Sequence, residues 1–253
     1  GYIYAIYLLK YRNFFGQLRY ITKTHLVITV YISECGKVTP VGVALIANGT
    51  TAQHGEIPWY AGIYEKKKKF YQQICGGTLV NRNVVISAAH CFWGLDLAER
   101  KEKVLPAKNY AVAVGKIYRP WNNQKDVDVQ KSDVSPRPPM DGSAVLILSK
   151  PFDYKPFIRP ICLSFDTEFD ERQLTPGSMG KIAGWGLTAP NSTKAKTLQV
   201  VELPVVDTDQ CNENVPPEFK EFITLDKFCA GYLNAGMKTR FNYYSPRQTL
   251  WPL

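Results

Sequence analysis

The chain has 253 residues, of which 45% are hydrophobic and 21% charged, a balance typical of a globular protein that excludes wholesale disorder. The 31 Lys and Arg residues outnumber the 22 Asp and Glu residues, which gives a net charge of +9. The excess is not focused on one stretch, so we expect no nucleic-acid partner. No apolar run approaches the roughly 18–20 residues of a membrane span.

Residues 1–34 have no steady hydrophobic period, and we assign them no structure. From residue 58 onward, short β-type runs alternate with turn residues, which predicts an all-β barrel or sandwich. We expect a loop over the polar, Pro-rich residues 121–141 and a short helix over 207–214, with Asp207 as N-cap. The expected strands are residues 59–64, 77–80, 84–88, 110–117, 144–148, 181–185 and 198–203.

Six cysteines and two glycosylation sequons, at Asn48 and Asn191, favour an oxidising, secretory compartment. Three disulfides could form in fifteen ways, and no Cys-x-x-Cys pair indicates a zinc ribbon or a redox site. His90 and Cys91 are adjacent, but no other ligand pair supports a metal site, so we expect no metal. Residues 1–34 lack the features of a signal peptide and the chain begins with Gly1, so we do not expect this to be the natural N-terminus.

The most specific signal lies at residues 87–91, which read Ser-Ala-Ala-His-Cys at the end of an expected strand. Ala88 and Ala89 allow close packing beneath the imidazole of His90, and a disulfide at Cys91 would fix the backbone beside it. A histidine held in this way can act as a general base. The alternative interpretation is a buried histidine with a structural role only. The segment resembles that around the catalytic histidine of the chymotrypsin/trypsin-like serine proteases.

Further landmarks of that family follow in its order, so the resemblance runs from about Cys35 to Tyr232. They are Ile-Ala-Asn-Gly at 46–49, Pro-Trp at 58–59, Ile-Arg-Pro-Ile-Cys-Leu at 158–163, Ala-Gly-Trp-Gly at 183–186, the strand 198–204 with Cys211, and Phe-Cys-Ala-Gly at 228–231.

The resemblance implies an all-β fold of two six-stranded antiparallel barrels, the second of them incomplete. It divides the chain into an unassigned prefix (1–34), the end of a pro-region (35–45), a first barrel (46–157) and a second (158–253). It implies disulfides Cys35–Cys162, Cys75–Cys91 and Cys211–Cys229. With barrel-closing strands missing after residue 232, we expect the second barrel to expose unpaired edges.

The resemblance also implies a secreted, extracellular zymogen without a cofactor that is cleaved between Leu45 and Ile46. Because the family usually has Arg or Lys where this chain has Leu45, the activator should prefer a large apolar residue. The implied partners are protein substrates, an upstream activating protease and serpin-type inhibitors. The branch that this chain resembles is that of arthropod modular serine proteases, which start immune cascades.

The chain departs from the family at two of the three catalytic positions. It contains no Gly-Asp-Ser-Gly-Gly segment and therefore no nucleophile serine; Ser143 and Ser178 stand in the wrong places. Two residues separate Asp141 from Ala144 where the family has one, and in a strand an extra residue turns a side chain to the other face unless a bulge absorbs it. Asp141 is either the triad aspartate or a solvated turn residue.

Two functions remain. The first is a serine endopeptidase whose sequence is truncated or mis-assembled here, so that this chain is inactive as written. The second is a non-catalytic protease homologue that binds partners in a cascade. Separately, residues 65–69 carry four consecutive lysines, from Lys66 to Lys69, and should form an exposed hairpin loop near the substrate cleft. That loop is either merely solvated or attracts acidic substrates or polyanions.

Overall fold

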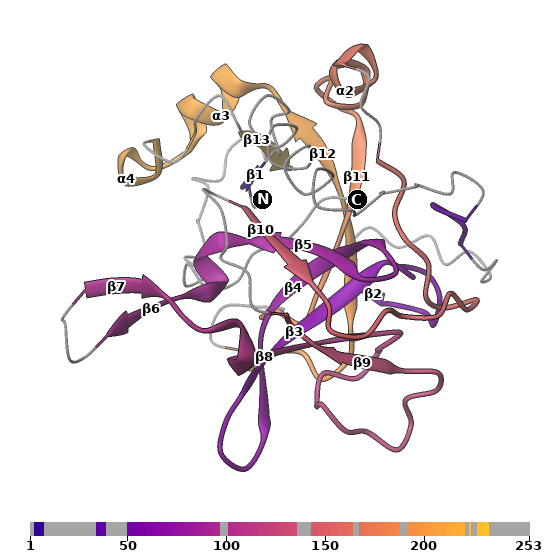
Figure 1. Cartoon of the computed structure of the whole chain (residues 1–253). Helices are drawn as coiled ribbons and strands as arrows, with labels where there is room; N and C mark the ends of the chain where they lie inside the picture. The colour runs from indigo at the N-terminus through magenta and orange to yellow at the C-terminus, as the bar shows by residue number, and fades with distance from the viewer. Residues whose placement is uncertain are drawn as a thin grey trace.

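The computed structural model describes residues 3–7, 34–38, 50–96, 101–135, 143–163, 167–187, 192–220, 223 and 227–232. Most of the regular structure is β-sheet, and the helices are short (Figure 1). None of the helices in this part of the chain has the length and apolar character that crossing a membrane requires.

The larger sheet has six antiparallel strands in the order β10-β5-β4-β3-β8-β9 (Figure 1). All residues of β5 and β8 are buried, as their β-branched and small apolar side chains predict. The sheet curls, and its outer strands meet where Val134 bridges Leu148 and the Ser135 amide donates to the Ile147 carbonyl at 2.7 Å. The strands are β3 (Tyr60–Lys66), β4 (Tyr71–Asn81), β5 (Val84–Ala88), β8 (Tyr110–Val114), β9 (Gln130–Asp133) and β10 (Ser143–Ile147).

The smaller sheet has five strands, and its outermost one comes from the N-terminal prefix. β1 pairs antiparallel with β13 along all five of its residues, from Ile3 opposite Gly231 to Tyr7 opposite Lys227. The prefix to which we assigned no structure therefore covers the outer edge of β13, where we expected an unpaired edge. The strands are β1 (Ile3–Tyr7), β2 (Thr50–Thr51), β11 (Met179–Gly184), β12 (Gln199–Val206) and β13 (Lys227–Gly231).

Trp185 joins the two sheets in one hydrophobic core. Its ring packs edge-on against Tyr60, with centroids 5.0 Å apart, and its indole N–H donates to the Ile117 carbonyl at 3.0 Å. Gly62 of β3 makes room for this ring, because a Cβ there would lie 2.9 Å from a ring carbon of Trp185. The packing of Trp185 between the sheets therefore requires a glycine at position 62.

The predicted helix at residue 207 is confirmed as α3 (Thr208–Asn214). The Asp207 carboxylate accepts from the amides of Asp209 and Gln210 at 2.9 and 3.2 Å, which satisfies two otherwise unpaired donors.

The loop predicted over 121–141 is wrong at residues 130–133, which form the strand β9 and pair with β8. The sequence did not indicate this strand because its residues are polar and only Ser132 is buried. The remaining elements are β6 (Trp93–Asp96), β7 (Lys101–Val104), α2 (Thr167–Gln173), α4 (Pro217–Lys220) and the 3-10 turns η1 (Ala89–Phe92) and η2 (Ala107–Asn109).

A mostly β chain with a curled sheet and few helices fits the trypsin-like fold that the sequence resembles. The division into two six-stranded barrels stays a prediction.

Candidate active site

His90 lies on η1, directly after the buried strand β5. The other three residues of this turn, Ala89, Cys91 and Phe92, are buried, whereas His90 is only partly buried. The turn therefore packs its neighbours into the core and leaves the imidazole accessible. This is the arrangement that the small residues of Ser-Ala-Ala-His-Cys predict.

The backbone on both sides of His90 is fastened to β4. On one side, the fully buried Ser87 donates its hydroxyl to the Gly76 carbonyl at 2.8 Å. On the other, the Cys75–Cys91 disulfide joins the turn to the same strand, with a Cα–Cα distance of 6.3 Å. Together these two links hold the main chain that carries the imidazole. Ser87 is not among the residues predicted for the site, and its place in the motif at 87–91 is the sequence signal for it.

The two cysteines near His90 do not supply metal ligands. The ligand atoms of Cys75, His90 and Cys91 lie within 4.8 Å of one another. However, both sulfur atoms belong to the disulfide, and a cysteine binds metal as the thiolate. The two cysteines therefore form a disulfide that fixes the backbone next to the histidine.

The remaining two disulfides that the resemblance implies are also present. Cys211–Cys229 joins α3 to β13, and Cys35–Cys162 joins the segment 34–38 to the linker between the sheets. Beside the latter, Glu34 forms an ion pair with Arg159, and the Gly36 amide donates to the Pro160 carbonyl at 2.9 Å. Gly36 has a φ of +65°, and a Cβ there would lie 2.9 Å from the Cys162 sulfur, so this close approach requires glycine.

Other residues predicted for the site fall outside the described part of the chain. They are Leu45, Ile46, Asn48, Asp141 and Asn191.

Burial lowers the pKa of His90 below its usual value of about 6.5, because desolvation disfavours the charged imidazolium. At neutral pH the side chain is therefore neutral, the form that a general base needs.

This shift predicts a pH dependence of stability. The unfolded chain binds a proton at His90 more readily than the folded chain does. The contribution of neutral His90 to the free energy of unfolding is therefore full above pH of about 6.5, and it is lost as the pH falls toward the pKa of the folded protein. NMR titration of the His90 ring should give a pKa below about 6.5. In urea unfolding between pH 7.5 and 5, His90→Gln should lose less stability than the wild type. Equal losses in both proteins would contradict the assignment.

The chain is similar to known proteins over most of its length. Residues 46–240 match the model of the trypsin family. Limulus clotting factor C of Carcinoscorpius rotundicauda is 30% identical in an alignment of 214 residues that covers 79% of this chain and 20% of that protein. The venom peptide isomerase heavy chain of Agelenopsis aperta is 29% identical over 200 residues, 74% of this chain and 75% of that protein. The modular serine protease of Drosophila melanogaster is 28% identical over 207 residues, 78% of this chain and 31% of that protein.

The match to clotting factor C thus spans a fifth of that protein's length. The trypsin-family match covers more than half of this chain and includes the strand, disulfide and turn that hold His90. The chain therefore belongs to the trypsin family of serine proteases.

Proposed function

We propose that the protein is a secreted serine endopeptidase of the trypsin type, built on two β-barrels, in which His90 is the general base. The observation that carries the proposal is a partly exposed imidazole whose backbone is fixed on both sides, by Ser87 and by the Cys75–Cys91 disulfide. A neutral imidazole in this position can take the proton of a serine hydroxyl and later return it to the leaving amine.

The register of β10 supports Asp141 as the partner of His90. β10 begins two residues after Asp141, and its first residue, Ser143, pairs with Ala88, two residues before His90. β5 ends at Ala88 and His90 lies on the turn that follows, so this pairing places the start of β10 beside the start of that turn. A carboxylate at this point would orient the imidazole and stabilise its protonated form during the reaction.

We further propose that the 253-residue chain is itself inactive, because no serine stands in a Gly-Asp-Ser-Gly-Gly segment. Incubated with a fluorophosphonate probe, the oxidised chain should remain unlabelled, and it should not hydrolyse peptide substrates. Trypsin at the same concentration serves as the labelled control. Labelling of a serine in this chain would show that an unrecognised nucleophile is present.

Activation should occur between Leu45 and Ile46. In a form of the protein that carries the nucleophile segment, the new amino group of Ile46 would then order the oxyanion hole, as in the rest of the family, and the Cys35–Cys162 disulfide would keep the released pro-segment attached. Amino-terminal sequencing of the processed protein, before and after reduction, should give Ile46 as the new terminus. A different new terminus would rule out this cleavage site.

The setting that we propose is an extracellular proteolytic or immune cascade, with protein substrates, an upstream activator and serpin-type inhibitors. Two of the similar proteins are named as a clotting factor and a modular serine protease, and these names support the proposal. Three disulfides support secretion, and Asn48 and Asn191 are the proposed glycosylation sites.

The second candidate function is that of a non-catalytic homologue which binds other cascade proteins. The missing nucleophile segment favours it. The genomic sequence downstream of the codon for Asn234 distinguishes the two. An in-frame Gly-Asp-Ser-Gly-Gly segment there would establish the endopeptidase, whereas a continuous reading frame without one would establish the homologue.

A further inference from the structure

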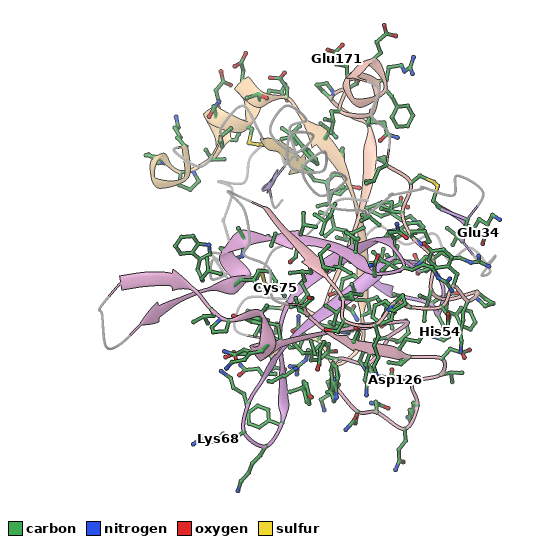
Figure 2. The ribbon with its side chains drawn as sticks, in the orientation of Figure 1. Glu34, His54, Lys68, Cys75, Asp126 and Glu171 are labelled. Atoms are coloured by element: carbon green, nitrogen blue, oxygen red, sulfur yellow. A yellow bond between two sulfur atoms is a disulfide. The ribbon has the colours of Figure 1, made fainter. Side chains whose placement is uncertain are left out.

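The hairpin between β3 and β4 ends in a turn of three lysines and a phenylalanine. The Lys67 amide donates to the Phe70 carbonyl at 2.8 Å, which closes the turn over residues 67–70. The hairpin extends away from the two sheets, and Lys68 lies at its end (Figures 1 and 2). Its four turn residues are exposed.

Two of the four lysines in this hairpin pair with carboxylates, and the other two do not. Lys66 pairs with Asp133 at 2.8 Å, and Lys67 pairs with Glu65 at 2.6 Å. Within the described part of the chain, no carboxylate pairs with Lys68 or Lys69. Two adjacent ammonium groups are thus available to a ligand.

An apolar side chain lies directly beside these cations. Phe70 follows Lys69 in the sequence and is 60% exposed. The next residue, Tyr71, stacks on Trp121 with ring centroids 4.1 Å apart and planes at 8°, while the Lys131 ammonium lies 4.7 Å from the Trp121 ring centre. The base of the hairpin is therefore packed against the loop after β8, immediately beside the turn. A fixed base lowers the backbone entropy that the turn loses when a ligand binds.

We propose that the turn 67–70 binds an acidic segment of a partner protein, with the carboxylates on Lys68 and Lys69 and an apolar side chain on Phe70. A polysaccharide fits less well, because only two uncompensated lysines lie in the turn and a sugar polymer has no apolar side chain to cover the phenylalanine. A protein segment can present both chemistries within a few residues. This binding does not depend on the proposed catalytic function, so each can fail separately.

The test measures binding of a fluorescein-labelled peptide, Glu-Asp-Leu-Glu-Asp-Phe-Glu-Glu, to the full oxidised chain by fluorescence anisotropy. The Lys68→Gln/Lys69→Gln variant should bind it about tenfold more weakly at 50 mM salt. The matched control is Lys108→Gln/Lys150→Gln, which removes two exposed lysines elsewhere and lowers the net charge equally. It should change the affinity by less than about twofold.

The apolar contact is tested with Phe70→Ser and with a peptide in which serine replaces both apolar residues. Either change should weaken binding, and the two combined should weaken it little further, as expected of one shared contact. Affinity should fall as salt rises from 50 to 300 mM. Equal loss in the two lysine double variants, no effect of Phe70→Ser, or binding of a heparin oligosaccharide but not the peptide would each overturn the proposal.

Discussion

Asp126→Asn is expected to lower the free energy of unfolding by about 3–5 kcal/mol, because it leaves a buried ammonium group without its counter-ion. Lys116 and Asp126 form an ion pair in which the two side chains are 1% and 6% exposed. The Lys116 ammonium also lies 3.4 Å from the Trp121 carbonyl, and Asp126 accepts weakly from the Tyr118 amide. The buried pair therefore connects residues at the two ends of the loop after β8 and stabilises its conformation. For a chain of this length, the melting temperature should fall by about 6–20 °C.

A surface ion pair between the same loop and the segment after β10 provides the control. Lys155 and Asp128 also form an ion pair, at 2.7 Å, but their side chains are 41% and 37% exposed. Asp128 has a φ of 61°, a conformation that asparagine tolerates, so Asp128→Asn changes the charge with little backbone strain. We expect a loss of less than about 1 kcal/mol. Equal losses in the two variants, measured by urea unfolding, would contradict the burial argument.

The Asp126→Asn variant should recover part of its stability at alkaline pH. Burial lowers the pKa of Lys116 in the folded protein, and the bond to Asp126 opposes that shift. Without the carboxylate, the folded pKa falls further below the unfolded value. The unfolded chain then binds more protons between those two values, so stability rises with pH through this window. Replacing both residues, as in Lys116→Met/Asp126→Leu, should remove this dependence and restore much of the stability.

His90→Ala is expected to lower kcat about 10⁶-fold in a form of the protein that carries the nucleophile segment, because the serine loses its general base. The side chain is only partly buried, so unfolding of the variant in urea should change little. Turnover of a chromogenic peptide gives the rate. A variant that folds and retains wild-type turnover would remove His90 from the mechanism.

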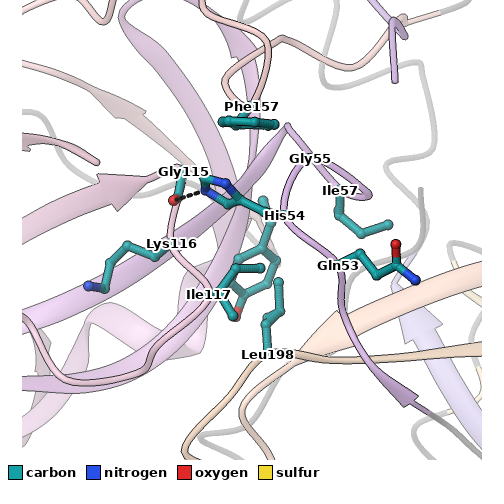
Figure 3. Close-up of a pocket in the computed structure, with 10 residues that line it drawn as sticks. Gln53, His54, Gly55, Ile57, Gly115, Lys116, Ile117, Phe157 and Leu198 are labelled. Atoms are coloured by element: carbon teal, nitrogen blue, oxygen red, sulfur yellow. Dashed lines mark hydrogen bonds between the residues drawn. The ribbon is translucent and has the colours of Figure 1, made fainter. Parts of the chain in front are cut away.

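His54→Ala is the matched control for this experiment. His54 packs on Phe157 with ring centroids 3.9 Å apart, and its Nε2 atom lies 3.3 Å from the Gly115 carbonyl oxygen (Figure 3). The small pocket around it is lined also by Ile57, Ile117 and Leu198, and none of its lining residues comes from η1 or β10. His54→Ala should reduce stability through lost packing and leave kcat within about threefold of the wild type.

The sequence predicts best those elements whose pattern follows directly from burial. Residues 84–88 are a strand at the predicted bounds because all five side chains are buried and three are β-branched. Asp207 is identified correctly because capping is a local interaction between neighbouring residues. The strand β1 is missed because its partner β13 lies more than 200 residues away in the sequence, and hydrophobic periodicity carries no information about such a partner. The strand β9 is missed because it is polar and only Ser132 of its residues is buried.

The candidate site is predictable to a similar extent. The motif at 87–91 identifies His90, and the small residues around it account for its exposure. The bond from Ser87 to Gly76 depends on the register between β4 and β5, which shifts near Asn81 and cannot be derived from either strand alone. The role of Asp141 depends in the same way on how the chain enters β10, so it stays a proposal.

The pairing of β1 with β13 has a consequence for synthesis on the ribosome. β1 is made before its partner, residues 227–231, which follows more than 200 residues later. At usual elongation rates of about 5–20 residues per second, the N-terminal strand waits for about 10–45 s before it can pair. During this time the strands of the six-stranded sheet, all within residues 60–147, can assemble without it. The smaller sheet is therefore completed last, and until then β1 presents unpaired backbone groups to any other chain nearby.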